Sequence, residues 1–156
     1  MTDGRQEANA EPQLEVHVLD MRPDYPEHRI ILPVGRLLSA VARVDRSVLA
    51  GQWEIWTAWG CHGEHACAIE DQMDEADVEP LRVTGPEFFG PFMADPEVYF
   101  EFLVMRRISP DPEVVLGVFD SSWLFLRAGA SLVRAVAAQF EEVRFTTDLG
   151  DFRRWF

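Results

Sequence analysis

The spacing of hydrophobic positions along the chain predicts two helices. Apolar side chains in the segment 34–50 recur every three to four residues, which places them on one face of a helix. Pro33 suits the start of this helix, and Gly51 suits the position just after its end. The segment 130–141 has the same spacing and predicts a second helix, with Ser131 as its cap.

Alternating or continuous apolar runs predict strands in the rest of the chain. The segments 97–108, 113–119 and 122–127 are separated by turn signals, and we expect them to form an antiparallel meander. Alternation along the first of them predicts one face with Val98, Phe100, Phe102 and Val104, and an opposite face with Glu97 and Glu101. Further strands are predicted at 14–18, 52–59, 81–84 and 143–147, the second with Trp53, Ile55 and Trp59 on one side.

These elements predict an α+β fold, in which two main helices pack on a mostly antiparallel sheet of five to seven strands. Two segments fit more than one structure: 61–79 reads as a loop or a poorly amphipathic helix, and 86–96 as a packed loop or one helical turn. The segment 1–12 has almost no large apolar side chain, so we expect a disordered leader followed by a single domain over 13–156.

The charge of the chain narrows its range of partners. With 27 acidic and 14 basic residues, the formal net charge is −13. Such a field repels nucleic acids and anionic membranes and attracts basic proteins. All basic residues are arginine, so lysine-dependent chemistry is excluded.

No apolar run reaches the ~20 residues of a membrane span, no secretory signal is visible, and cysteines are few, so we expect a soluble, cytoplasmic protein.

The segment from Cys61 to Cys67 is the densest group of reactive side chains, because it also contains His62 and His65. Thiolates and imidazoles are preferred zinc ligands, but structural zinc sites usually draw on two separated pairs, and no second pair exists. The alternative is a polar turn with one thiol buried. His62 and Glu64 match half of the zinc deaminase signature, but the cysteines that complete it are missing. We therefore predict no metal and no cofactor.

Signatures of catalysis are absent from the sequence. No nucleophile elbow, dinucleotide-binding or phosphate-binding loop occurs. Glu97 with Glu101, or the histidines His17 and His62, are the groups that an enzyme of this sequence would have available. Acids on the exposed face of a strand are far more often solvated than catalytic. We therefore assign no catalytic residue, and the balance is against an enzyme.

Charge patterning supplies two surface features. Between Glu64 and Glu79 the chain has seven acidic residues and no basic one, which predicts either a surface for a basic partner or a solubilising loop. The second feature is a stripe of arginines on one side of the first helix, at Arg36, Arg43 and Arg46, which predicts pairing with carboxylates or an anion site. The predicted partner-binding residues are Glu70, Asp71, Asp74, Glu75, Asp77 and Glu79.

A small, acidic, single-domain protein without catalytic motifs resembles in type the immunity proteins, which neutralise toxins by stoichiometric binding. We therefore expect an acidic protein-binding or inhibitor domain, with tryptophans as anchors and the acidic run for electrostatic steering. One alternative is a small enzyme or ligand-binding domain with a pocket lined by the strands of 97–127. Another is an accessory subunit of a larger complex.

Overall fold

The computed structural model describes residues 11–19, 32–76, 80–120 and 123–147. Most of the predicted leader, the segment 20–31, and the candidate residues Asp77 and Glu79 lie outside the described residues. None of the described helices is long and apolar enough to cross a membrane.

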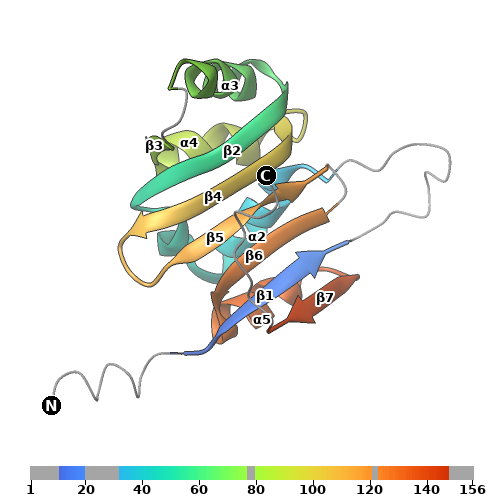
Figure 1. Cartoon of the computed structure of the whole chain (residues 1–156). Coiled ribbons are helices and arrows are strands. Elements are labelled where there is room, and N and C mark those ends of the chain that lie inside the picture. The colour runs from blue at the N-terminus through green and yellow to red at the C-terminus, as the bar shows by residue number, and fades with distance from the viewer. Residues whose placement is uncertain (1–10, 20–31, 77–79, 121–122, 148–156) are drawn as a thin grey trace, which may run out of the picture.

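Seven described strands form one antiparallel sheet, in the order β3-β2-β4-β5-β6-β1-β7 (Figure 1). The predicted α+β fold is confirmed, and β4, β5 and β6 form the expected meander. The strands are β1 (Gln13–Val18), β2 (Gln52–His62), β3 (Leu81–Thr84), β4 (Tyr99–Ser109), β5 (Val114–Phe119), β6 (Trp123–Gly129) and β7 (Val143–Thr146). The helices are α2 (Val34–Asp45), the short 3-10 helix η1 (Arg46–Leu49), α3 (Glu64–Ala76), α4 (Gly85–Ala94) and α5 (Ala130–Ala137).

One face of the sheet is covered by helices α2, α4 and α5, which lie behind the strands in Figure 1. The main hydrophobic core lies between these helices and the sheet, and its largest fully buried side chains include Trp53, Phe89 and Phe100. A smaller cluster, Val104, Val115 and Phe125, lies on the other face of the sheet. The strands therefore separate two apolar layers of unequal size.

The first predicted helix is shorter than its apolar period indicated. α2 ends at Asp45, whose side-chain Oδ1 accepts a hydrogen bond from the backbone N–H of Ser47 at 3.0 Å and so starts η1. Gly51 then adopts φ 92°, a conformation that favours glycine, and turns the chain into β2. The side chain of Asp45 therefore ends α2, because its hydrogen bond with Ser47 competes with the backbone hydrogen bonds of a longer helix.

The two segments left open by the sequence are both helices. In α3, Ala66 and Ile69 are buried and Met73 is half-buried, so a narrow apolar stripe recurs at three- and four-residue steps. In α4, Pro86 occupies the first turn, where proline is tolerated, and Pro91 lies only three residues before the helix ends. Three phenylalanines, Phe88, Phe89 and Phe92, are buried by α4, and this burial outweighs the cost of the interior proline.

The expected face assignment of β2 was wrong. Trp53 and Ile55 are fully buried in the main core, but Trp59 is 50% exposed on the opposite face. The cause is an irregularity in the pairing with β4 between Ile55 and Thr57, because one extra residue reverses which face the following side chains occupy.

The expected face assignment of β4 was also wrong. Phe100 belongs to the main core, whereas Phe102 contacts Phe119 and stacks on Trp59 on the other side. Opposite the residue between these two phenylalanines, Gly60 adopts φ 72°, so the paired strands do not keep regular alternation there. Strict period-two reasoning therefore failed at this end of the sheet.

The predicted positions of two polar residues, Glu97 and Ser131, also differ from those in the structure. Glu97 precedes β4 and lies in a turn, where its N–H donates to Asp95 at 2.9 Å, so it does not share a strand face with Glu101. Ser131 lies inside α5, and its N–H and hydroxyl donate to the carboxylate of Glu11 at 3.0 and 2.7 Å. These bonds lower the pKa of Glu11 below its usual value.

Candidate functional site

Helix α3 places most of the predicted partner-binding residues on one surface. The helix packs on β2 and β3 at the edge of the sheet through its apolar stripe, and it lies beyond β2 in Figure 1. The carboxylates of Asp71, Asp74 and Glu75 are exposed, and Glu70 is half-buried. We call these four residues the acidic face of α3.

The acidic face of α3 is electrostatically unfavourable in the free protein. Glu70 with Asp74, and Asp71 with Glu75, are like-charged pairs four residues apart, a spacing at which side chains repel. The last turn of α3 contains no basic residue, so its carboxylates lie at the negative end of the helix dipole. Within the described part of the chain, no ion pair joins an arginine to any of the four.

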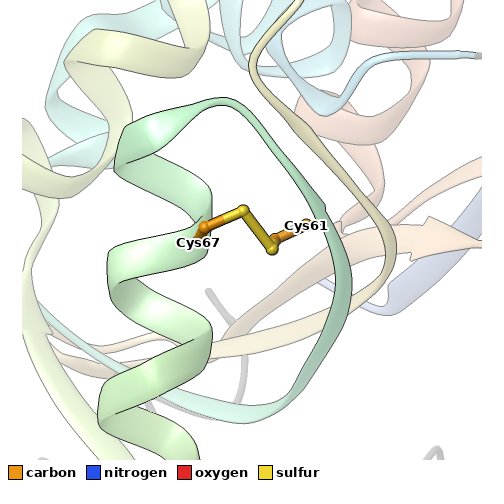
Figure 2. Close-up of a disulfide and its surroundings, with 2 residues drawn as sticks. All are labelled: Cys61 and Cys67. Carbon is orange, nitrogen blue, oxygen red and sulfur yellow. A yellow bond between two sulfur atoms is a disulfide. The ribbon is translucent and has the colours of Figure 1, made fainter.

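A disulfide between Cys61 and Cys67 ties the start of α3 to the end of β2 (Figure 2). The two Cα atoms lie 5.0 Å apart, within the ordinary range of a disulfide. The sharp turn between strand and helix depends on Gly63, which adopts φ 90°. The disulfide thus fixes the orientation of α3 at a place where its apolar contact with the sheet is narrow.

We expect the disulfide to stabilise the domain modestly. It closes a loop of six residues, so the chain-entropy estimate for its loss is about 2 kcal/mol. Replacing Cys61 and Cys67 by serine should lower the free energy of unfolding in denaturant titrations by that amount. Adding a reductant to the wild type should reproduce the effect and should leave the double variant unchanged. Equal stability of oxidised and reduced wild-type protein would contradict this prediction.

The side chains between the cysteines do not converge on a common point. The ring of His62 stacks on Tyr99 with centroids 4.2 Å apart, while Nε2 of His65 donates to the carbonyl of Phe88 at 3.0 Å. Among the described residues, no group of three or more metal-ligating side chains is arranged to hold an ion. With both sulfurs in the disulfide, no thiolate is available as a ligand. Absence of metal from the purified protein stays a prediction, which elemental analysis tests.

A continuous row of rings crosses the face of the sheet that the described helices leave uncovered. It runs across β1, β6, β5, β4 and β2, and neighbouring centroids are 4.1 to 5.0 Å apart. Such ring contacts stabilise the fold beyond the effect of burying apolar surface area. We call it the aromatic row, and its members are His17, Trp123, Phe119, Phe102 and Trp59.

A buried ion pair lies beside the β1 end of the aromatic row. Glu15 Oε1 accepts a hydrogen bond from Nε of Arg127 at 3.0 Å and lies 3.0 Å from Nη2 of the same arginine, and Oε2 lies 2.7 Å from Nε2 of His17. Glu15 and Arg127 are only 3% and 7% exposed. Burial raises the pKa of Glu15, but the hydrogen bond from His17 and the charge of Arg127 outweigh it, so the net pKa is lowered. A carboxylate that orients an imidazole in this way is also found in proton-transfer sites.

The arginine stripe lies over two cavities on the helical side of the molecule. Arg36 and Arg43 line a cavity of about 310 Å³ between α2, the end of α4 and the segment after α5. Arg46 instead lines a cavity of about 530 Å³ between η1 and α4, together with Phe89 and Met93. Neither cavity is lined by β4, β5 or β6, the strands expected to form a pocket in a ligand-binding reading.

Comparisons with protein-family models, with curated proteins and with solved structures found no match for this chain. Arguments about its function therefore rest on its own residues.

Sequence reasoning missed the disulfide, the aromatic row and the pairing of Glu15 with Arg127. The row joins five strands that are not all consecutive in sequence, and the ion pair joins residues 112 positions apart. One signal was available: Glu15 and His17 alternate with the apolar residues of β1, which places both on the same face. Their partner on β6 was not readable without the strand order.

Proposed function

We propose that this protein is a stoichiometric binding domain, of the immunity-protein type, that associates with a basic surface of a protein partner through helix α3. The observation that supports the proposal is the acidic face of α3, where four carboxylates lie together without an arginine partner among the described residues. No catalytic residue is assigned, and direct binding of nucleic acid or membranes is not expected from a net charge of −13.

Repulsion within α3 is the physical reason for this choice. In most proteins, helix propensity, packing and electrostatics all favour the native fold. Features that cost stability without local compensation tend to mark functional surfaces. A basic partner would remove both penalties, because its cations would separate the like-charged pairs and would oppose the negative end of the helix dipole. The free energy released on binding would add to the long-range attraction that speeds association.

The attachment of α3 favours a preformed surface. The buried Ala66 and Ile69 hold one side of the helix on the sheet, so the exposed side need not be ordered when a partner arrives, and in the oxidised protein the disulfide adds to this attachment. Trp59 lies on β2, five residues before α3 begins, and is half exposed. We propose it as an aromatic anchor for the same partner, because buried tryptophans dominate many interfaces.

Association kinetics test the proposal, after affinity capture from the native cell has supplied a partner. The variant with Asp71→Asn, Asp74→Asn and Glu75→Gln should associate about tenfold more slowly, with a smaller change in dissociation. The wild-type association rate should fall as salt rises, and the variant should lose part of that dependence. Exposed charges contribute little to stability, so the variant should unfold at nearly the same denaturant concentration.

A matched control removes three negative charges at the other end of β4. Asp45, Asp111 and Glu113 lie near Arg107 or Arg106, far along the strand from α3. The variant Asp45→Asn, Asp111→Asn and Glu113→Gln has the same net charge as the α3 variant, and asparagine can still cap η1. Equal slowing by both variants would show that only net charge matters. If the association rate depends neither on salt nor on the substitutions in either variant, the acidic face of α3 serves only solubility.

A cytoplasmic location is part of the proposal and has a consequence for the disulfide. Cytosolic thiols are kept reduced, so Cys61 and Cys67 would react there with an alkylating reagent added to intact cells. Protection of both residues from alkylation would instead indicate an oxidising compartment. Binding measured with and without a reductant then shows which redox form the partner recognises.

One observation favours the alternative of a small enzyme, namely the bond between Glu15 and His17 next to Trp123. In that reading, Glu15 orients the imidazole and His17 exchanges a proton with a substrate that stacks on the aromatic row. Turnover of a small molecule that is lost in His17→Gln, with the fold intact, would replace the binding proposal. Turnover that survives the substitution would exclude His17 as its base.

A further inference from the structure

The cavity beside the start of α2 combines cationic and apolar walls. Its volume is about 310 Å³, at the lower end of the range for small-ligand sites. Arg36, Ser39 and Arg43 lie along α2 with spacings of three and four residues, so they share one side of the helix. Phe92 and Met93 of α4, together with Phe140 after α5, supply the apolar part of the lining.

Neutral groups hold Arg43 in the cavity. Its Nη1 donates to Oε1 of Gln139 at 3.3 Å, and Nε2 of Gln139 donates to the carbonyl of Ala40 at 2.8 Å. No carboxylate of the described residues lies within ion-pair distance of Arg43. A guanidinium has five N–H donors, so most of its hydrogen-bonding capacity remains for a further acceptor.

The second arginine contacts an aromatic ring. The guanidinium carbon of Arg36 lies 5.7 Å from the centroid of the Phe140 ring, within the range of a cation–π contact. This contact places a positive charge next to an apolar surface inside the same cavity. α2 has no acidic residue before Asp45, so the charged side chains that this helix itself contributes to the cavity are both positive.

We propose that this cavity binds a small organic anion, with its carboxylate or phosphate on Arg36 and Arg43 and its aromatic or aliphatic body against Phe140, Phe92 and Met93. Planar guanidinium groups match the geometry of both kinds of anion and often bind them through two parallel hydrogen bonds. The hydroxyl of Ser39, between the two arginines, is a further donor. This site is separate from α3 and goes beyond the proposed partner binding.

Titration of the full-length protein with phenyl phosphate tests the proposal. Two-dimensional NMR should show saturable shifts of backbone amides in α2, at the end of α4 and around residues 139–140. Phenol lacks the anionic group, so it tests the contribution of the phosphate to binding. Inorganic phosphate lacks the ring, so it tests the contribution of the apolar body. Both should bind about tenfold more weakly than phenyl phosphate or not at all.

Arg43→Gln should weaken the binding of phenyl phosphate about tenfold, and Arg46→Gln, which removes the same charge from the neighbouring cavity, should weaken it less than about twofold. Arg43 and Arg46 are both exposed, so both variants should keep the wild-type unfolding midpoint. Four results would overturn the inference: no saturable shifts at millimolar probe, equal affinity for inorganic phosphate, equal affinity for phenol, or equal effects of the two substitutions. The last result would assign the attraction to general charge or to the cavity of Arg46.

Discussion

Arg127→Met is expected to lower the free energy of unfolding by about 3 kcal/mol or more, because it leaves the carboxylate of Glu15 buried without its cation. Methionine retains most of the length and apolar contact of the arginine stem, so the loss reports mainly on the charge. Glu15 retains its hydrogen bond with His17, which compensates only part of the lost interaction. Denaturant titrations at neutral pH measure the difference.

The double variant Glu15→Leu with Arg127→Met is the control for this experiment. Removing both charges leaves no buried carboxylate, so the double variant should be more stable than Arg127→Met alone. A double-mutant cycle then isolates the coupling between the two side chains. If the double variant were the least stable of the set, the loss would come from packing and not from an unpaired charge.

The pH dependence of stability gives an independent measure of the same pair. The pKa of Glu15 is lowered in the folded protein, so its contribution is complete above the unfolded value near 4.5 and is lost as the pH falls through the folded pKa. In Arg127→Met, the charge and hydrogen bond of Arg127 are lost, so the pKa of Glu15 should be higher than in the wild type. The difference in stability between the two proteins should therefore be largest at neutral pH and should shrink as the pH falls towards and below 4.5, because protonation of Glu15 removes the charge that Arg127 compensates. A difference in the free energy of unfolding between wild type and Arg127→Met that stays constant from neutral to acidic pH would contradict this role of Glu15.

Phe100→Ala is expected to destabilise the domain by about 4 kcal/mol, the usual size for emptying a fully buried phenylalanine site. The ring of Phe100 lies in the main core with its centroid 5.7 Å from that of Phe92, so its loss leaves a cavity between β4 and α4. Thermal and denaturant unfolding of the purified variant measure the loss.

Phe102→Ala is the matched comparison, because it makes the same change two residues further along β4. Phe102 is only half-buried and lies in the aromatic row, so its truncation should cost about half as much or less. The two variants together test the break in alternation at this end of the sheet. Equal losses would mean that both rings share one face, as the regular pattern of the sequence predicted.

The sequence by itself determined the fold class and most of its elements. The predicted meander 97–127 corresponds to β4, β5 and β6, and the predicted helices at 34–50 and 130–141 correspond to α2 with η1 and to α5. The helices were readable because each buries one face at a period of about 3.6 residues, and the strands were readable because they are short apolar runs separated by turn signals. α3 and α4 were ambiguous because α3 has a narrow apolar stripe and α4 contains prolines.

For the candidate sites, the sequence supplied the residues but not their neighbours. It identified the acidic run and the arginine stripe, since both depend only on local spacing. Only the tertiary structure placed Trp59 and Phe102 on the outer face, joined Glu15 to Arg127, and brought Gln139 and Phe140 to Arg36 and Arg43. The physical reason is that strand order, bulges and helix packing are set by the burial of the whole chain, and no local pattern encodes contacts between residues about a hundred positions apart.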